Sequence, residues 1–338
     1  MSAIAESGRR RRPADRSGEM SRSVGALVVA LSLIVAAAAC EPADPTPDPD
    51  VQARRDARGE RTVRIVYPEW SSEIASAHLF AAVLRERLGY RVTLEAVAVE
   101  EMWERVAQGE ADAMLGAWLP VTHAEYLAEY GEELEDLGPN LEGARIGLVV
   151  PASTPGFITD EAGRTGRELV TVREIGELAT HADRFRGRVV GIESGAGVVQ
   201  RAREALERYD LARRFRLVES DEERMLEELS SAVRAGRWIV MTGWTPHWAF
   251  ERYNLRFLDD PQSVFGGEER IHTMVRPGLA DDLPDAYRVL DRISYRPTDL
   301  ERIMWWIEQD DRRDPYAQAI RWIETNRNAV DEWVEGVE

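Results

Sequence analysis

The stretch Ile239-Val240-Met241-Thr242-Gly243-Trp244-Thr245-Pro246-His247-Trp248 begins as a short apolar run and ends in a turn that carries two tryptophans, a proline and a histidine. An apolar run of this length, bounded by Gly and Pro, predicts a buried strand that opens into a loop. Loops at the ends of strands are where binding residues are usually displayed. We therefore expect Trp244 at the rim of a site.

A second stretch follows the same pattern. Residues 113–120 read Ala-Met-Leu-Gly-Ala-Trp-Leu-Pro and are followed by Val-Thr-His. Two separate strand ends that each deliver a tryptophan beside a proline indicate two walls of one aromatic site, formed by Trp118 and Trp244. The alternative is that both indoles belong to the core, but the Gly and Pro beside each one are unfavourable in a packed strand interior.

The wider pattern alternates strands with helices. Strands are expected at residues 63–67, 91–97, 113–118, 144–151, 189–192, 215–218, 239–244 and 271–276, and helices at 73–88, 99–109, 122–134, 195–209 and 221–235. Such alternation predicts βαβ units and a mostly parallel sheet. The pattern restarts after Pro151, which indicates a second α/β unit inserted into the first. Everything from Pro284 onward is expected to be helical.

Composition and charge exclude several classes of function. The chain has 338 residues and a formal charge of -18, without a basic stripe, so nucleic acid is not an expected partner. The histidines at 78, 123, 181, 247 and 272 are scattered, and no zinc-type spacing, nucleophile elbow or lysine-bearing phosphate loop is present. We therefore predict that the protein is not an enzyme and uses neither a metal nor a cofactor.

The amino terminus predicts export. Residues 24–39 form an apolar segment that follows several arginines, and Cys40, the only cysteine, comes directly after it. The segment is too short for a comfortable span of about 20 residues and ends in small residues, so residues 1–39 are expected to be a signal peptide. Met20 is an alternative start. Cys40 resembles the lipid-acceptor cysteine of bacterial lipoproteins, and residues 40–61, rich in Pro and Asp, are expected to form a flexible tether.

Several motifs together resemble, in order and spacing, the glycine betaine and proline betaine substrate-binding proteins of ABC importers. The motifs that carry the resemblance are WSSEIAS (70–76), AWLPVTH (117–123), DLGPN (136–140), GIESGAG (191–197), TGWTPHW (242–248) and FGGE (265–268). The family implies a two-lobed periplasmic-binding-protein fold of type II, with a ligand cleft between two α/β lobes and two crossings between them. Lobe one would comprise residues 62–148 and 271–338, and lobe two residues 149–270.

The resemblance also implies a ligand cage. Trp118 and Trp244 match two of its three aromatic residues, and the third aligns with Tyr295, which is alternatively a half-buried structural residue. Trp70 could complete the cage, as its counterpart does in choline-binding relatives. Those relatives carry an Asp near the position of Ser72, and its absence here favours a zwitterion over choline.

The ligand carboxylate is held in the family by backbone amides at a helix start, here those of Glu73 and Ile74, with the Glu73 side chain expected to point away. The sequence Gly195-Ala196-Gly197 opens another helix and is the alternative anion site. His247 is either a ligand contact or a residue that orders its loop.

The resemblance therefore implies a membrane-anchored lipoprotein, facing the periplasm or cell exterior, that binds glycine betaine or a related zwitterion. It would deliver this osmoprotectant to an ABC-type permease and its ATPase. A choline or carnitine receptor of the same kind, and a betaine sensor that is not coupled to transport, remain as alternatives. The same chemistry supports a cage, because a quaternary ammonium has no N–H to donate and is attracted to aromatic faces.

Overall fold

The computed structural model describes residues 53, 56–59, 61–153 and 168–337. The predicted signal peptide, the lipid-acceptor Cys40 and most of the tether lie outside the described residues. All of these residues belong to one compact unit. Residues 56–59 are helical, and the Arg58 guanidinium lies 2.6 Å from the Asp285 carboxylate. This part of the expected tether is therefore held against the folded chain.

The first part of the fold alternates strands and helices. In chain order it contains β1 (Thr62–Tyr67), α2 (Ser71–Glu86), β2 (Arg91–Ala96), α3 (Val99–Ala107), β3 (Ala113–Leu119), α4 (Ala124–Tyr130), a 3-10 turn η1 (Gly131–Glu133) and β4 (Glu135–Pro151). Helix α3 places Met102, Trp103 and Val106 in the core, as their helical spacing predicts.

A second α/β lobe follows β4 and repeats the alternation. It contains η2 (Ile175–His181), β5 (Arg188–Gly191), α5 (Gly197–Arg208), β6 (Arg216–Glu219), α6 (Glu222–Arg234), β7 (Met241–Thr245), α7 (Ala249–Tyr253) and β8 (Leu255–Phe257). The chain then returns through β9 (Glu269–Val275), α8 (Leu279–Asp282), α9 (Pro284–Arg292), α10 (Pro297–Gln309), α11 (Pro315–Thr325) and α12 (Arg327–Val334).

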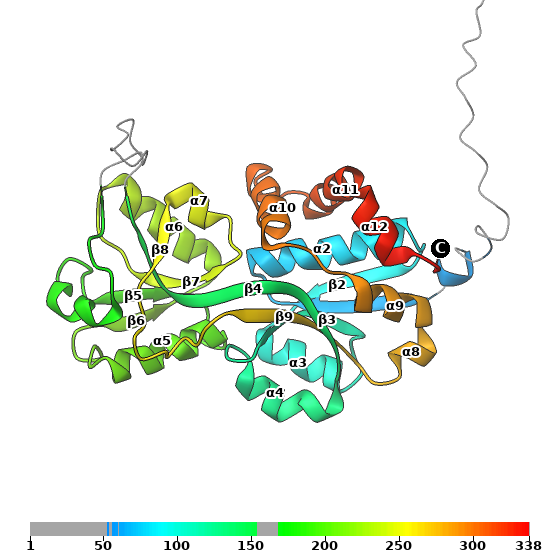
Figure 1. Cartoon of the computed structure of the whole chain (residues 1–338), viewed down its shortest axis with the longest axis horizontal. Coiled ribbons are helices and arrows are strands. Elements are labelled where there is room, and N and C mark those ends of the chain that lie inside the picture. Colours follow the sequence, from blue (N-terminus) through cyan, green and yellow to red (C-terminus); the bar gives the residue numbers. More distant parts are fainter. Residues whose placement is uncertain (1–52, 54–55, 60, 154–167, 338) are drawn as a thin grey trace, which may run out of the picture. The chain divides into compact units, whose positions relative to one another are not determined.

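The strands form one continuous order, β2-β1-β3-β9-β4-β7-β5-β6, with β8 paired to β4. Within each lobe the βαβ neighbours are parallel, as expected: β1 with β2 and β3, and β5 with β6 and β7. The two strands that connect the lobes, β4 and β9, are instead antiparallel to their neighbours. The sheet is therefore mixed at its centre, where these two strands run between the lobes (Figure 1).

Strand β4 is much longer than the predicted strand at 144–151. Its first half pairs with β9 up to Ala144, and its second half pairs with β7 from Arg145 onward. The sequence around Gly138, Pro139 and Gly143 is typical of a turn, and both glycines have positive φ. The register shifts in the β4–β9 pairing accommodate these residues, so turn-forming residues are built into a bulged strand.

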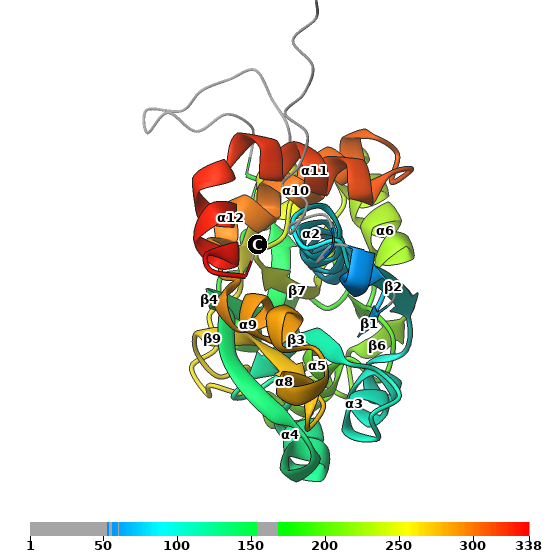
Figure 2. The ribbon, with the colours of Figure 1, turned by 90° about the vertical axis from the view of Figure 1, so that its right-hand side faces the viewer.

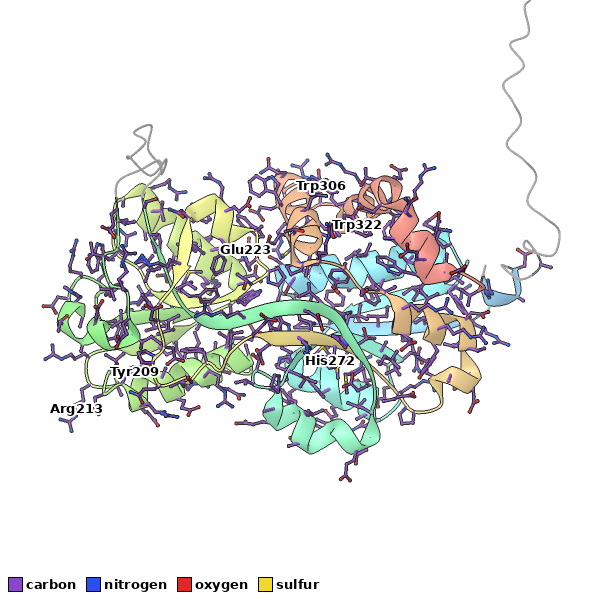
Figure 3. All side chains as sticks on the ribbon, viewed as in Figure 1. Tyr209, Arg213, Glu223, His272, Trp306 and Trp322 are labelled. Atoms are coloured by element: carbon purple, nitrogen blue, oxygen red, sulfur yellow. The ribbon has the colours of Figure 1, made fainter. Side chains whose placement is uncertain are left out.

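Helices cover both faces of the sheet in each lobe. In lobe one, α2 with α10, α11 and α12 lies on one face and α3 on the other (Figure 2). In lobe two, α5 lies on the face opposite α6 and α7 (Figure 1). Of the four carboxy-terminal tryptophans, Trp322 and Trp333 are buried and stack with ring centroids 5.7 Å apart. Trp322 is labelled on α11 in Figure 3. Among the described residues, none of the helices combines the length and apolarity needed to cross a membrane.

Candidate functional site

Trp118 comes from the end of β3 and is the first wall of the site. Its side chain is 3% exposed, and its indole Nε1 donates to Glu73 Oε1 at 3.3 Å. Its backbone N–H donates to Nδ1 of His123 at 3.1 Å. Burial lowers the pKa of His123 to about 3, so this ring stays neutral and keeps an acceptor for that bond. The loop after β3 therefore fixes the orientation of Trp118.

Trp244 is the second wall and comes from β7 in the other lobe. It lies within the strand itself, one residue before its end, because β7 runs only from Met241 to Thr245. Its ring is 4% exposed and stands edge-on to His247, with centroids 4.9 Å apart. Each of the two tryptophans is followed one residue later by a cis X-Pro bond, Leu119-Pro120 and Thr245-Pro246.

Trp70 is the third aromatic residue and immediately precedes helix α2. Its indole Nε1 donates across the cleft to Glu193 Oε1 at 2.6 Å. Burial raises the pKa of the Glu193 carboxyl, and the bond from Trp70 opposes that rise. Glu193 follows β5, so the bond joins lobe one to lobe two and ties the Trp70 ring in place.

These three indoles line one small cavity between the lobes. Lobe one contributes Trp70, Trp118 and Thr122, while Ile146 of β4, Ile192, Trp244 and the start of α5 complete the lining, the last through Ala196, Gly197 and Val198. No charged side chain is among these lining residues. Apart from Thr122, the walls are therefore aromatic and aliphatic.

The start of α5 is suited to an anion. The first N–H groups of a helix have no partner within it and carry partial positive charge, and Ala196 at the N-cap supplies no side-chain bond. A Cβ on Gly197 would lie 2.1 Å from the carbonyl oxygen of Thr122, so this helix start approaches the opposite lobe as closely as only Gly permits. The Tyr126 hydroxyl donates to the carbonyl of Gly195 at 3.0 Å and adds a further contact between the lobes.

The start of α2 does not face the cavity as the sequence predicted. Ile74 N–H donates to the carbonyl of Trp70 at 2.8 Å, as in any helix, and neither Glu73 nor Ile74 lines the cavity. The Glu73 side chain does not point away: it is 2% exposed, lies against Gly116 and contacts Trp118. Burial raises the pKa of Glu73 to about 7. A carboxyl at this position would oppose the approach of an anionic group.

Two other predicted residues lie outside the cavity lining. The Tyr295 hydroxyl hydrogen-bonds Ser76 Oγ at 2.7 Å, and its ring stands edge-on to Phe80 of α2. His247 accepts at Nδ1 from the Ala249 N–H at 3.0 Å and faces Glu222 with Nε2 at 3.1 Å. Both ring nitrogens of His247 are therefore engaged within its loop and on α6.

Sequence reasoning missed Glu193, Thr122, Ile146 and Ile192 as parts of this site. Three of them fall within the quoted motifs, where Glu193 and Ile192 precede the glycine-rich turn and Thr122 follows Pro120. Ile146 carries no sequence signal beyond its place in an apolar strand. Within the described residues, no group of three or more His, Cys, Asp or Glu side chains is placed to hold a metal ion.

Comparison with known proteins identifies the family. Residues 61–325 match the substrate binding domain of ABC-type glycine betaine transport systems. The chain belongs to this family. A family member from Listeria monocytogenes, the glycine betaine/carnitine transport binding protein GbuC, is 41% identical over 151 residues, which cover 44% of this chain and 50% of GbuC. The matched part thus spans about half the length of that relative.

Solved structures of the family confirm the two-lobed fold. Lactococcal OpuAC, in its closed-liganded conformation with glycine betaine, has 35% sequence identity and a TM-score of 0.73, covering 81% of this chain and 100% of that one. The glycine/betaine/L-proline-binding protein ProX from Borrelia burgdorferi has 32% identity and a TM-score of 0.74, covering 82% of this chain and 97% of that one. The predicted α/β periplasmic-binding-protein architecture is correct.

Proposed function

We propose that the protein is an extracytoplasmic receptor that binds glycine betaine, or a closely related quaternary ammonium zwitterion, and delivers it to an ABC-type permease. The observation that carries the proposal is that Trp70, Trp118 and Trp244 line a single cavity between two lobes. The relatives described above are transport binding proteins, not enzymes. Anchoring through Cys40 is part of the proposal and rests on the sequence alone.

The cage proposed here is formed by three tryptophans, with Trp70 in place of Tyr295. Each aromatic face contributes roughly 0.5 to 2 kcal/mol to the binding of a cation. Three faces therefore fall short of the about 8 kcal/mol that a micromolar complex requires. The ligand needs a second binding group, and in a zwitterion that group is the carboxylate.

The carboxylate would bind at the start of α5. Ala196, Gly197 and Val198 line the same cavity as the indoles, and a helix start favours an anion through its free N–H groups and its dipole. The start of α2, the first expectation, is less suitable because Glu73 and Glu222 place carboxyl groups there. A ligand with a cation at one end and an anion at the other fits this division of the cavity.

Calorimetric titration of the purified chain with glycine betaine, proline betaine, choline, carnitine and unmethylated glycine tests the proposal. Binding of a betaine, with glycine silent, is the expected result, because glycine lacks the methylated cation. Binding of choline alone would show that the carboxylate site at α5 is wrong. Silence with all five compounds would contradict the proposed ligand class.

A further inference from the structure

The cage residue Trp70 stands at a helix start that is capped from the other lobe. Trp70 occupies the N-cap position of α2, and its side chain makes no capping hydrogen bond. Glu222 of α6 supplies the cap instead: the Ser71 N–H donates to Glu222 Oε2 at 2.8 Å, and the Ser71 hydroxyl donates to Oε1. Ser71 belongs to lobe one and Glu222 to lobe two, so this cap exists only while the lobes are together.

His247 holds the Glu222 carboxylate in this position. Because Nδ1 of His247 accepts from the Ala249 N–H, its Nε2 carries a proton and donates to Glu222 Oε1 at 3.1 Å. The same histidine ring packs edge-on against Trp244. One chain of contacts therefore links the cage wall of lobe two, through His247 and Glu222, to the cage wall of lobe one.

Burial makes these bonds strong. Glu222 is 3% exposed and His247 4% exposed, and a buried carboxylate must be hydrogen-bonded to remain charged. Burial alone would raise the pKa of Glu222, but the bonds from His247 and Ser71 outweigh it and hold that pKa below its usual value. Charge-assisted bonds at a helix start, where the dipole also favours an anion, are stronger than neutral ones.

We propose that Glu222 is the positioning residue that couples lobe closure to the cage, by capping α2 from the opposite lobe and setting Trp70 against the ligand. The inference rests on the proposed function, in which Trp70 is a cage wall. Opening the lobes exchanges the bonds from Ser71 for water, whereas the bond from His247 stays within lobe two, so Glu222 caps α2 in the closed state alone. Ligand affinity then depends on Glu222 although it does not line the cavity.

Two substitutions and one matched control test the cap. Glu222→Gln places an amide N–H₂ against either Ser71 or His247, both of which donate, so at least one bond is lost. Ser71→Ala removes only the hydroxyl bond. Glu223→Gln is the control, because Glu223 shares the first turn of α6 with Glu222 but is exposed (Figure 3). Its dipole contribution to α6 is the same, and it makes no contact with α2 among the described bonds.

The full chain is titrated with glycine betaine by calorimetry, and its melting temperature is measured with and without the ligand. We expect Glu222→Gln to weaken binding by about tenfold or more, since a charge-assisted bond is lost. It should lower the ligand-bound melting temperature more than the ligand-free one, because the bonds from Ser71 form only in the closed state. Ser71→Ala should weaken binding less, and should cost little more once Glu222 is already replaced. Glu223→Gln should bind as the wild type does. The proposal is overturned if Glu222→Gln binds the ligand as tightly as the wild type does. It is also overturned if the substitution lowers the ligand-free melting temperature as much as the ligand-bound one.

Spin-label distances separate this inference from the proposed ligand. Labels at Glu125→Cys on α4 and Glu207→Cys on α5, both exposed sites in opposite lobes, report lobe opening when Cys40 is replaced by Ser. If the wild type binds none of the ligands, the proposed function fails and the cap is judged by distance alone. A longer average distance in Glu222→Gln than in the wild type then supports the cap. Identical distance distributions in the two proteins overturn it.

Discussion

At the scale of single residues, Gly197 makes a close approach between the lobes. The first turn of α5 lies against the backbone of Thr122, and a Cβ at this position would sit 2.1 Å from the Thr122 carbonyl oxygen. No side chain fits such a distance, so any larger residue must separate the two lobes at the cavity. The backbone conformation of Gly197 is not the constraint, because its φ is not positive.

Gly197→Ala is expected to weaken ligand binding by more than about tenfold without destabilising the ligand-free protein, since Ala is favoured over Gly in a helix by up to about 1 kcal/mol. Calorimetry and thermal unfolding measure the two effects. Gly267→Ala is the control, because a Cβ there meets nothing within 4 Å. Equal affinity in Gly197→Ala and the wild type would show that the lobes do not approach this closely when the ligand is bound.

A second residue-scale feature is the buried carboxyl of Glu73. Burial raises its pKa from 4.5 to about 7, so the folded state holds the proton more tightly than the unfolded chain does. The stabilisation is complete below about pH 4.5 and is lost as the pH rises through about 7. At higher pH the ionised carboxylate is buried with one oxygen that has no hydrogen-bond partner.

Glu73→Gln removes this pH dependence and can still accept the hydrogen bond from the Trp118 indole. We expect the free energy of unfolding of the variant to rise relative to that of the wild type as the pH increases from 5 to 8, by roughly 3 kcal/mol at most. Urea unfolding at both pH values provides the measurement, with the exposed Glu69→Gln as control. If the difference in free energy of unfolding between Glu73→Gln and the wild type stays constant with pH, the raised pKa of Glu73 is contradicted.

At the scale of elements, α2 supports both the proposed cage and the carboxy-terminal part of lobe one. Its start carries Trp70 and accepts the cap from Glu222, while its second turn carries Ser76, which binds the Tyr295 hydroxyl. Tyr295 thus packs on the side of α2 and its backbone N–H donates to the carbonyl of Asn140 in β4 at 3.0 Å. From these contacts we expect Tyr295 to contribute to the stability of lobe one.

Tyr295→Phe is expected to lower the free energy of unfolding by about 1 kcal/mol, the usual net contribution of one buried hydrogen bond. Tyr295→Leu also loses the edge contact with Phe80 and should be less stable than the Phe variant. Neither should change the dissociation constant for the ligand by more than about twofold, measured by calorimetry under conditions where both are folded. Weaker binding in the Leu variant alone would place the Tyr295 ring in the cage.

At the scale of the whole folded unit, residues 47–338, two strands connect the lobes. β4 exchanges its partner between Ala144 and Arg145, and β9 pairs with both β3 and β4 before the chain leaves for α8. The lobe bounds 62–148, 149–270 and 271–338 remain a prediction, with the exchange in β4 falling shortly before residue 148. A cage divided between lobes is complete only when they meet, so a ligand that contacts both lobes favours the closed state.

Trp118→Ala and Trp244→Ala, one from each lobe, are each expected to weaken ligand binding by more than about tenfold, in line with one lost cation–π face and the lost apolar contact. Saturating glycine betaine should raise the melting temperature of the wild type by mass action and that of either variant much less. Calorimetry and thermal unfolding measure these effects, and the replacement of Trp306, which is half-exposed on α10 (Figure 3), is the control. Unchanged affinity in both variants would eliminate the proposed cavity as the ligand site.

The sequence by itself determined the α/β class, the resumption of the strand–helix alternation after β4 and the delivery of Trp118 and Trp244 from two strand ends. Local signals suffice for these features, because apolar periodicity and turn residues act over a few neighbouring positions. Local signals predicted only the second half of β4, because Gly138, Pro139 and Gly143 are turn-forming residues and it is the pairing with β9 that imposes a bulged strand there. Long-range pairing outweighed local preference there.

The tertiary structure alone decided which aromatic side chains share the cavity and which helix start faces it. Trp70 joins Trp118 and Trp244, while Tyr295 packs against α2, although nothing in the spacing of these residues separates the two outcomes. Glu222 contacts Ser71, which lies 151 positions away in the chain, and His247, which lies 25 positions away. No sequence pattern predicts contacts at such separations. Contacts between the lobes depend on how the two halves of one continuous sheet are brought together, and that information resides in the packing of the whole unit.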